Sequence, residues 1–388
     1  MPHVLKIAHL TWEFPSPTET FVANEVEALA QLGCGVKIIA LKPPGGTRRA
    51  LAFARSVVVR PITAARLGVA SLKTGVPLWM LDALLLLERR IEGESFALVH
   101  AQFGYLGRLC VPVLSWFGSL PLVVSFRGQD ASALPRKRPG IYAPLFRRAS
   151  AFLARSEAMK RDLVAIGCPA DRTCVHHSGI DLDQFPFQER HAPPAESLPV
   201  RILLVGRLIE KKGVPDAVAA FAEARRRHPN IQLRIIGDGP MREQIEREIA
   251  ARNAAESITL LGPKSHAEVA EEMAAAHLFM LPCRTASDGD KEGIPNAIME
   301  AMASGLPVLS TRHAGIPECV EDGVSGLLVA EGDTAALADR LCRLLEHPDL
   351  WPGMGRAGRA KIEAEFNREI QARGLIAIYE KILRHGET

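Results

Sequence analysis

The sequence predicts an α/β protein of two domains, each built on a doubly wound parallel sheet. Short apolar runs of strand length alternate with segments of helical periodicity almost from end to end, which is typical of parallel strands joined by helices. The alternation stops in the polar, proline-rich segment 186–199, PFQERHAPPAESLP, and then restarts. The length of 388 residues is that of two or three domains.

We therefore place a first domain at 1–190, a linker at 191–199 and a second domain at 200–365. Two doubly wound domains joined by a linker leave a cleft between them. Ligands of such sheets bind outside the carboxyl ends of the strands. The residues that follow each strand are therefore the first candidates for a site.

Each element follows from its local pattern. In the first domain, strands are expected at Val4–Leu10, Val36–Leu41, Ala97–His100, Leu122–Phe126, Ala151–Ala154 and Thr173–His176. Helical stripes separate them at Phe21–Leu32, in 50–91, and near 105–117, 141–149 and 156–166. The segment 50–91 holds one or two helices, of which Leu78–Ile91 has the better pattern. In the second domain, strands are expected at 200–206, 231–236, 258–261, 278–281, the apolar run that ends at Thr311, and 326–329. Its helices are expected at 214–228, 240–252, 265–275, after Gly293, at 334–346 and at 351–364.

Charge is distributed unevenly along the chain. Residues 1–190 hold 23 Lys and Arg against 15 Asp and Glu, a net charge of +8, whereas residues 191–388 hold 24 against 29, a net charge of −5. The basic half, with Arg136-Lys137-Arg138 and Arg147-Arg148, suits either an anionic surface or ligand or a solvated basic face. Aromatic residues make up only 5% of the chain, which disfavours a nucleic-acid-binding protein with stacking platforms.

The sequence predicts a cytosolic protein that could also contact the membrane peripherally. The N-terminus MPHVLKIAHL starts on a strand-like pattern and lacks the features of a signal peptide. The longest apolar run is far shorter than the roughly 20 residues of a membrane span. Seven scattered cysteines form no CxxC pair, so we expect reduced thiols and no zinc site.

The stretch Leu281–Thr311, LPCRTASDGDKEGIPNAIMEAMASGLPVLST, is the main candidate site. It is typical of a strand end, a polar loop, a short helix and another strand. Pro295 suits the first helical position, and the N-terminus of that helix would attract a phosphate. Glu292 in the loop and Glu300 in the helix could then both address one polar part of a ligand such as a sugar nucleotide.

Basic residues and glycines follow the neighbouring strands. Gly206 and Arg207 end the first strand of the second domain and Lys212 follows five residues later, so both cations can reach one diphosphate. Gly237 and Gly239 lie in the loop GDGP after the next strand, which could be a phosphate loop or simply a turn. The motif is not a dinucleotide fingerprint, because GxGxxG is incomplete.

Metal and histidine chemistry have weaker support. Two DxD patterns, at Asp181–Asp183 and Asp288–Asp290, could hold Mg²⁺, but local hydrogen bonds and nearby cations explain them as well, so we expect no metal cofactor. His100 ends a strand and is a candidate for contact with a substrate, whereas His176-His177 suits a structural role. The sequence has no GxSxG elbow, which argues against a serine hydrolase.

Together these motifs resemble glycosyltransferase family 4, retaining sugar transferases with the GT-B fold of two facing Rossmann-like domains. The resemblance rests on GRLIEKKG, IIGDGP, ITLLG, EGIPNAIMEAMASGLPVLST, GIPE and GLLV in the second domain, and more thinly on ETFVANEVEAL, HAQFG, SFRGQD and HHSGIDLDQF in the first. It is most similar to the exopolysaccharide and colanic-acid branch. It also implies that the C-terminal segment 366–388 is a helix that crosses back onto the first domain.

The resemblance implies a role for each matching residue. Glu292 and Glu300 would be the EX7E pair, with Glu292 on the donor sugar and Glu300 on the ribose. Arg207 and Lys212 would bind the diphosphate and stabilise the leaving group. The remaining donor-site positions would line the base, sugar and phosphates: Gly206, Gly237, Gly239, Leu261, Gly262, Gly293, Ile294 and Pro295.

The first domain departs from the family pattern. Arg127 in RGQD replaces the His of HGxD that touches the donor sugar in many relatives. Its guanidinium could bind a sugar hydroxyl or carboxylate, or pair with Asp130. The segment Pro15–Thr20 occupies the place of a Gly-Gly pair that is common in the family. Its Glu19 and Thr20, with His100 and Asp130, are the expected acceptor-side residues.

We therefore expect a metal-independent retaining glycosyltransferase that moves a sugar from a nucleoside diphosphate to a lipid-linked glycan acceptor in exopolysaccharide synthesis. One alternative is a GT-B epimerase or phosphorylase. Another is a catalytically silent nucleotide-binding scaffold, although a scaffold would not need both glutamates and both cations. An oxidoreductase is disfavoured because GxGxxG and its acidic partner are missing.

Overall fold

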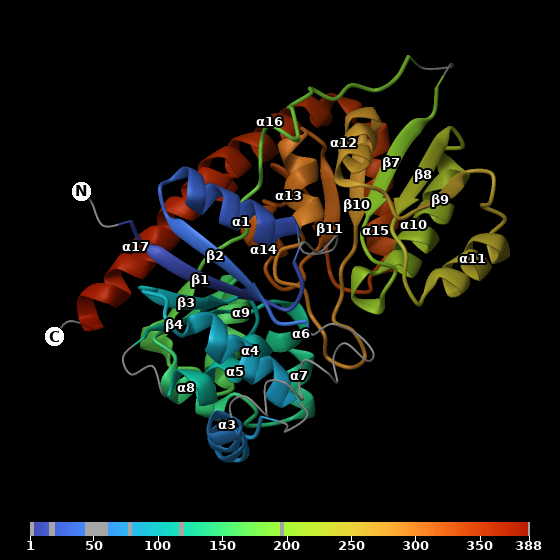
Figure 1. Ribbon diagram of the computed structural model, residues 1–388. Helices are drawn as coiled ribbons and strands as arrows, with labels where there is room; N and C mark the ends of the chain where they lie inside the picture. Colours follow the sequence, from blue (N-terminus) through green and yellow to red (C-terminus); the bar gives the residue numbers. More distant parts are fainter. Residues whose placement is uncertain are drawn as a thin grey trace. The chain divides into compact units, whose positions relative to one another are not determined.

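The computed structural model describes residues 4–14, 20–42, 61–76, 80–115, 120–194 and 198–386 (Figure 1). The chain forms two six-stranded sheets, and every pair of neighbouring strands in both is parallel. It divides into two compact units. Unit 1 comprises the described residues of Met1–Arg155, Met159–His176 and Gln371–Thr388, and unit 2 those of Ser156–Ala158 and His177–Ile370. The predicted α/β class with two parallel sheets is confirmed.

The sheet of unit 1 has the strand order β2-β1-β3-β4-β5-β6. Its strands are β1 (Lys6–Thr11), β2 (Gly35–Ala40), β3 (Leu98–Ala101), β4 (Leu122–Ser125), β5 (Ala151–Ala154) and β6 (Thr173–Val175). The chain leaves β1 toward β2 and returns to the other side at β3, so β1 and β3 flank the switch point of this sheet. All six strands fall within a few residues of the predicted segments.

Helices cover both faces of this sheet and bury its apolar side chains. One face packs against α1 (Thr20–Gln31) and α17 (Arg368–Gly386) through a cluster that includes Leu29, Leu98 and Leu375. The other face carries the larger core, formed with α3 (Pro61–Thr74), α4 (Leu81–Ile91), α5 (Gly104–Leu114) and α8 (Ala143–Arg148). Among the described residues, the unit also contains α6 (Gly128–Ala131), α7 (Ala133–Lys137), α9 (Glu157–Ala165) and a 3-10 turn at Ala170–Arg172.

The sheet of unit 2 has the order β12-β11-β10-β7-β8-β9, which is the Rossmann order read from its other edge. The strands are β7 (Val200–Val205), β8 (Ile231–Ile236), β9 (Ile258–Gly262), β10 (Leu278–Leu281), β11 (Val308–Thr311) and β12 (Gly326–Val329). Figure 1 colours this sheet from yellow-green at β7 to orange at β10 and β11. The switch point lies between β7 and β10, because the chain runs outward in opposite directions from these two neighbours.

The helices of unit 2 again cover both faces. Against one face lie α10 (Val214–Arg227), α11 (Arg242–Ala251) and α15 (Thr334–Glu346), and against the other α12 (His266–Ala275), α13 (Asn296–Ala303) and α16 (Trp351–Lys361). The described part of the unit also contains a short helix α14 (Ile316–Cys319), 3-10 turns at Glu210–Lys212 and Pro348–Leu350, and a π-helical turn at Ile362–Phe366. One continuous apolar core runs through it.

The units divide between His176 and His177, which is earlier in the chain than the segment marked as a linker by its composition. The reason is packing within unit 2: Phe185 is buried in its core, and buried Arg190 donates to the carbonyls of Ala274, Ala276 and Ser304. In the described residues no helix is long and apolar enough to cross a membrane.

Candidate functional site

The candidate site of unit 2 lies at the switch point of its sheet. The loop after β7 and the loop after β10 leave the carboxyl ends of neighbouring strands, where ligands of doubly wound sheets bind. The first loop carries Gly206, Arg207 and a 3-10 turn at Glu210–Lys212. The second carries Glu292 and leads into α13. The sheet order therefore brings together the two motifs that the sequence singled out.

Glu292 is held by two ammonium groups. Its Oε1 lies 3.1 Å from Lys212 Nζ and 3.3 Å from Lys211 Nζ. The three side chains are 14%, 12% and 5% exposed. A carboxylate so far removed from water is stable only when paired, and here one carboxylate has two partners.

These ammonium groups determine the ionisation of the site. Burial alone would raise the pKa of Glu292, but the charges of Lys212 and Lys211 and their hydrogen bonds outweigh burial and lower the pKa to about 2. Burial likewise opposes the charge of Lys212, yet the charge of Glu292 raises the pKa of that ammonium group. The site is therefore an ionised carboxylate with two cations at neutral pH.

A glycine makes this geometry possible. Gly213 ends the 3-10 turn with φ +63°, and a Cβ at this position would overlap the carbonyl oxygen of Pro282 at the start of the second loop. Only glycine combines this backbone conformation with such a close approach. The two loops can therefore lie against each other, with Lys211 and Lys212 directed at Glu292.

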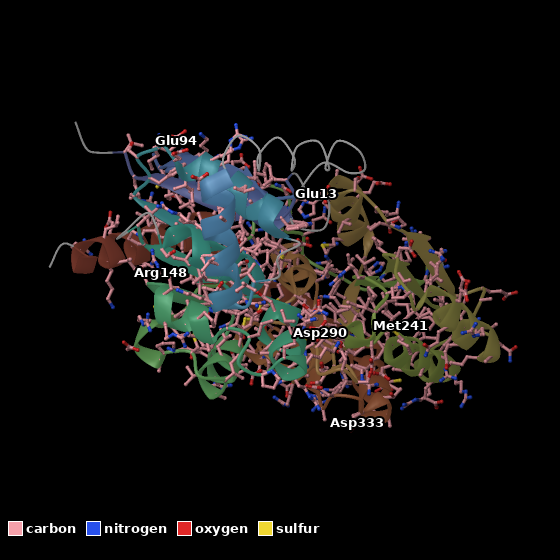
Figure 2. The ribbon with its side chains drawn as sticks, turned by 60° about the horizontal axis from the view of Figure 1, so that its bottom comes forward. Glu13, Glu94, Arg148, Met241, Asp290 and Asp333 are labelled. Atoms are coloured by element: carbon pink, nitrogen blue, oxygen red, sulfur yellow. The ribbon has the colours of Figure 1, made fainter. Side chains whose placement is uncertain are left out.

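Lys211 also ties the middle of the second loop to the first. Its Nζ lies 3.0 Å from Oδ2 of Asp290, which is labelled in Figure 2 in the loop before α13. Glu210 adds a second tie, since its carboxylate accepts from the backbone N–H and the hydroxyl of Ser287 at 2.9 and 2.7 Å. The second DxD pattern thus has one carboxylate in an ion pair. In the first pattern, Asp181 accepts from Gln184 and Arg368.

The short helix α13 begins one residue later than the sequence predicted. Pro295 is its N-cap, with ψ 124°, and Asn296 is the first helical residue. The extended conformation lets the chain turn out of the Gly293–Ile294 segment before the helix starts, and Pro295 needs no donor at either position. Glu300 points from this helix into the unit and is 8% exposed.

Glu300 has a partner that sequence reasoning missed. Nε2 of His266 lies 3.3 Å from its Oε1, and Nδ1 of His266 lies 2.7 Å from Oε1 of Gln184. The hydrogen bond to Glu300 raises the pKa of His266, against the opposing effect of burial. Because both ring nitrogens face oxygen atoms, the imidazolium form satisfies every contact. His266 follows β9 in sequence, and only the fold shows that it faces Glu300.

The glycines of the GDGP loop pack against the first loop. A Cβ at Gly237, with φ +136°, would overlap the carbonyl oxygen of Gly206, and one at Gly239 would lie 2.6 Å from that of Leu208. The Gly237 N–H donates to Gly262 at 2.9 Å. Gly262 and half-buried Leu261 end β9. The loop is therefore a tight turn that brings three strand ends together.

Arg207 differs from the two lysines. It is exposed, and within the described ranges no side chain forms a hydrogen bond or ion pair with its guanidinium. Its charge lies close enough to Lys212 to oppose the ionisation of that group. Arg207 is thus a solvent-facing cation beside the buried Lys212–Glu292 pair, an arrangement suited to an anionic ligand.

In unit 1, a second polar cluster surrounds Glu25 of α1. Its carboxylate lies 3.2 Å from Nε2 of His9, 2.7 Å from Nε2 of Gln102 and 3.3 Å from an Nη of Arg155. Burial would raise the pKa of Glu25, but His9, Arg155 and His100 lower it well below its usual value. None of these contacts was predicted, because the sequence pattern indicates only that Glu25 is a polar position on an amphipathic helix.

The cluster holds Arg127 in place. The guanidinium donates to the backbone and side-chain oxygens of Gln102, lies 4.0 Å from Glu25 and stacks on Phe21 with 3.6 Å from Cζ to the ring centroid. The backbone N–H of Arg127 donates to Asp130 at 2.6 Å. Arg127 is 11% exposed, so it is an ordered cation near the surface of unit 1.

The other acceptor-side candidates lie deeper or outside the described residues. His100 has no exposed surface, and its nitrogens contact Tyr379 and Ser125 at 2.6 and 2.9 Å, which favours a packing role over contact with an acceptor. Asp130 is buried and also accepts from Gly104, and burial raises its pKa to about 7. Glu19 lies outside the described residues, and Thr20 is the first residue of α1.

His9, Glu25 and His100 also have ligand atoms within 4.8 Å of one another, the spacing of a metal site. The guanidiniums of Arg155 and Arg127 already lie 3.3 and 4.0 Å from Glu25. Their charges neutralise this carboxylate and would repel a cation. The arrangement therefore suits a buried ionic network better than a metal.

Two units, each built on a doubly wound six-stranded parallel sheet, are the architecture of the GT-B glycosyltransferases. Family models agree: "Glycosyltransferase Family 4" matches residues 18–184 and "Glycosyl transferases group 1" matches residues 199–347. The chain is 33% identical to the amylovoran biosynthesis glycosyltransferase AmsK of Erwinia amylovora, over 97% of this chain and 100% of the relative. The chain belongs to the family 4 glycosyltransferases.

Solved structures show the same fold. Sucrose-phosphate synthase from Thermosynechococcus elongatus superimposes with a TM-score of 0.77 at 19% identity, covering 98% of this chain and 99% of that one. Anabaena Alr3699/HepE in complex with UDP and glucose gives a TM-score of 0.70 at 18% identity, covering 97% and 100%. The fold is therefore GT-B, as the sequence resemblance implied.

Proposed function

We propose that this glycosyltransferase is a retaining enzyme that transfers a sugar from a nucleoside diphosphate sugar to a lipid-linked glycan during exopolysaccharide synthesis. The observation that carries the proposal is the ionised Glu292 held by Lys211 and Lys212 beside exposed Arg207. AmsK supports the biosynthetic setting, since its name assigns it to amylovoran synthesis. The UDP and glucose bound by Alr3699/HepE support a nucleotide-sugar donor.

In this proposal the diphosphate lies between Arg207, Lys212 and the N-terminal end of α13. The two cations and the helix N–H groups stabilise the negative charge that develops as the glycosidic bond breaks. Glu292 binds the hydroxyls of the donor sugar. Glu300 binds those of the ribose once its hydrogen bond with His266 is released. The acceptor oxygen bonds to the anomeric carbon on the face that the diphosphate leaves, and a diphosphate oxygen takes its proton.

Lys211 has a separate task in this scheme. When Lys212 turns toward the diphosphate, Glu292 loses its nearest cation. Lys211 lies 3.3 Å from the same carboxylate oxygen, and its side chain is only 5% exposed. It therefore keeps Glu292 ionised and in place while the donor is bound.

The proposal is tested with a panel of UDP-, GDP-, TDP- and ADP-sugars. A donor that binds the native state raises the melting temperature, and release of the nucleoside diphosphate with an extract of lipid-linked glycans reports transfer. Glu292→Ala and Lys212→Ala should abolish transfer while the protein stays folded, and Lys264→Ala, which removes an exposed pair with Glu268, should not. Near-normal turnover in either site variant would refute the assignment.

The same assay separates the alternatives. Donor consumed without an acceptor would indicate an epimerase, and turnover that requires free phosphate would indicate a phosphorylase. A scaffold would bind a nucleotide and convert no donor. Unchanged transfer in EDTA is expected of the metal-independent enzyme that we propose.

We also propose that unit 1 approaches an anionic membrane surface from the cytoplasmic side. Arg136, Lys137 and Arg138 are exposed at the end of α7, and Val69 and Leu72 of α3 are 54% and 69% exposed. Cationic side chains near a membrane are attracted by its anionic lipids at roughly 1 kcal/mol each. Co-sedimentation with phosphatidylglycerol vesicles and not with phosphatidylcholine vesicles is the expected result, and equal recovery with both would refute it.

A further inference from the structure

A buried histidine holds the backbone of Glu292. His313 follows β11, its side chain has no exposed surface, and its Nε2 lies 3.0 Å from the backbone nitrogen of Glu292. Because a backbone N–H can only donate, Nε2 must accept. The proton of the neutral ring is therefore on Nδ1, which lies 2.7 Å from Oε1 of Glu331.

Both polar groups of the peptide unit before Glu292 are hydrogen-bonded. Its N–H donates to His313, and its carbonyl oxygen, that of Lys291, accepts from Lys211 Nζ at 3.4 Å. The N–H and C=O of a planar trans peptide point in opposite directions, so the two contacts come from opposite sides. Together they fix the plane of the peptide group through which the chain enters Glu292.

Glu331 connects this contact to the beginning of the same loop. While Oε1 accepts from His313, Oε2 accepts from the backbone N–H of Thr285 at 2.7 Å. Burial would raise the pKa of Glu331, but these hydrogen bonds outweigh it and lower the pKa. One ionised carboxylate after β12 therefore anchors the loop near its start and, through His313, at Glu292.

The residues after His313 extend the contact along the chain. The N–H of Gly315 donates to the carbonyl of Gly293 at 3.1 Å, so 313–315 lies along 292–294. Between the two contacts, Ala314 has φ +46°, a conformation that costs a residue with a Cβ of order 1 kcal/mol and persists only where surrounding contacts impose it. The segment 313–315 thus contacts 292–294 at both of its ends.

We propose that Glu331 and His313 are positioning residues that aim Glu292 at the donor sugar. The inference rests on the proposed function, because it assigns a role to residues behind the same site. Neither residue needs to touch the donor, and both act through the backbone of Glu292. Their hold does not depend on Lys212, so it persists when that lysine turns to the diphosphate.

The test compares two replacements of His313, of which one can still accept a hydrogen bond from the backbone of Glu292 and the other cannot. In His313→Gln, the amide oxygen can reach the position of Nε2 and accept from Glu292, whereas His313→Phe keeps the ring volume and accepts nothing. With the donor found in the panel, His313→Phe should lower kcat by roughly 30-fold or more, since a misplacement of about 1 Å can cost 100-fold. The KM for the donor should change less than about threefold, and His313→Gln should recover most of kcat.

A merely structural role predicts a different result. Both variants would then melt earlier and keep the kcat of the remaining folded protein. That outcome, or a His313→Phe enzyme with wild-type kcat, would overturn the inference. The kcat of Glu331→Gln should lie between those of His313→Gln and His313→Phe. The glutamine amide has one acceptor oxygen, whereas Thr285 and His313 each need one.

A measurement independent of activity keeps this inference separate from the proposed function. Long-range ¹H–¹⁵N spectra, with the His313 signals assigned from their loss in His313→Gln, should show a neutral ring with Nδ1 protonated. An imidazolium or the Nε2–H tautomer would overturn the inference. If the tautomer is as expected and the wild-type chain transfers no sugar from any donor, the proposed function fails, the hold on Glu292 stands and its assignment to catalysis is withdrawn.

Discussion

Replacing Lys211 by methionine should destabilise unit 2 by about 3 kcal/mol, although the substitution removes only one charge. Nζ of Lys211 lies 3.0 Å from Asp290 and 3.3 Å from Glu292, and the side chain is 5% exposed. At an effective dielectric constant near 20, each contact supplies about 5 kcal/mol of direct attraction. Removing the ammonium group from water offsets most of this, so the net value of the cluster is much smaller.

The loss on substitution nevertheless stays large, because two carboxylates remain inside. Removing one partner of a buried ion pair costs about 3–5 kcal/mol. Lys212 still faces Glu292 at 3.1 Å, so we expect the lower end of this range. For a unit of this size, 1 kcal/mol lowers the melting temperature by about 2–4 °C, which gives a decrease of about 6–12 °C.

Differential scanning calorimetry measures this decrease directly, and Lys264→Met is the matched control. It removes the same charge from an exposed pair with Glu268, for which about 0.5 kcal/mol or less is expected. A Lys211→Met and Asp290→Asn double-mutant cycle should show a coupling of about 1–3 kcal/mol. If Lys211→Met melts with the control, Lys211 is not what holds the loop.

Three further changes test other parts of the structure. Glu300 raises the pKa of His266 in the folded state above 6.5. The stability that this pair contributes is therefore complete below pH 6.5 and is lost as the pH rises through the folded pKa. The melting temperature of His266→Gln should lack this decline with pH. Gly237→Ala should destabilise unit 2 by roughly 3 kcal/mol or more, because the new Cβ would overlap the Gly206 carbonyl, and a denaturation midpoint equal to wild type would contradict this packing. Glu25→Gln should cost unit 1 about 3–5 kcal/mol in urea unfolding by leaving buried cations unpaired; a loss below about 1 kcal/mol would show that the network is not ionic.

The loop after β10 shows how far local pattern reaches. The apolar run ending at Leu281, the polar loop and the helix containing Glu300 all follow from periodicity and from Pro295. The helix start was displaced by one residue, since proline suits the N-cap and the first helical position almost equally and only the path of the preceding chain decides between them.

Burial separated residues that look alike in sequence. Lys211 and Lys212 are neighbours, and only Lys212 was singled out, yet Lys211 is the more buried and contacts two carboxylates. Similarly, His100 was a substrate candidate at a strand end, and its ring lies inside unit 1 against Tyr379 of the C-terminal helix. A partner 279 residues away in the chain leaves no local signal.

The sequence by itself determined the strands, most of the longer helices, the two parallel sheets and the pair of motifs around Lys212 and Glu292, because these elements have local periodicity and are bounded by turn residues. The tertiary structure decided how those residues are held. Contacts of Glu292 with His313, of His313 with Glu331, and of His266 with Glu300 join elements that only the strand order brings together. Such contacts depend on which residues are close in space, and this cannot be read from the residues that are neighbours in the chain.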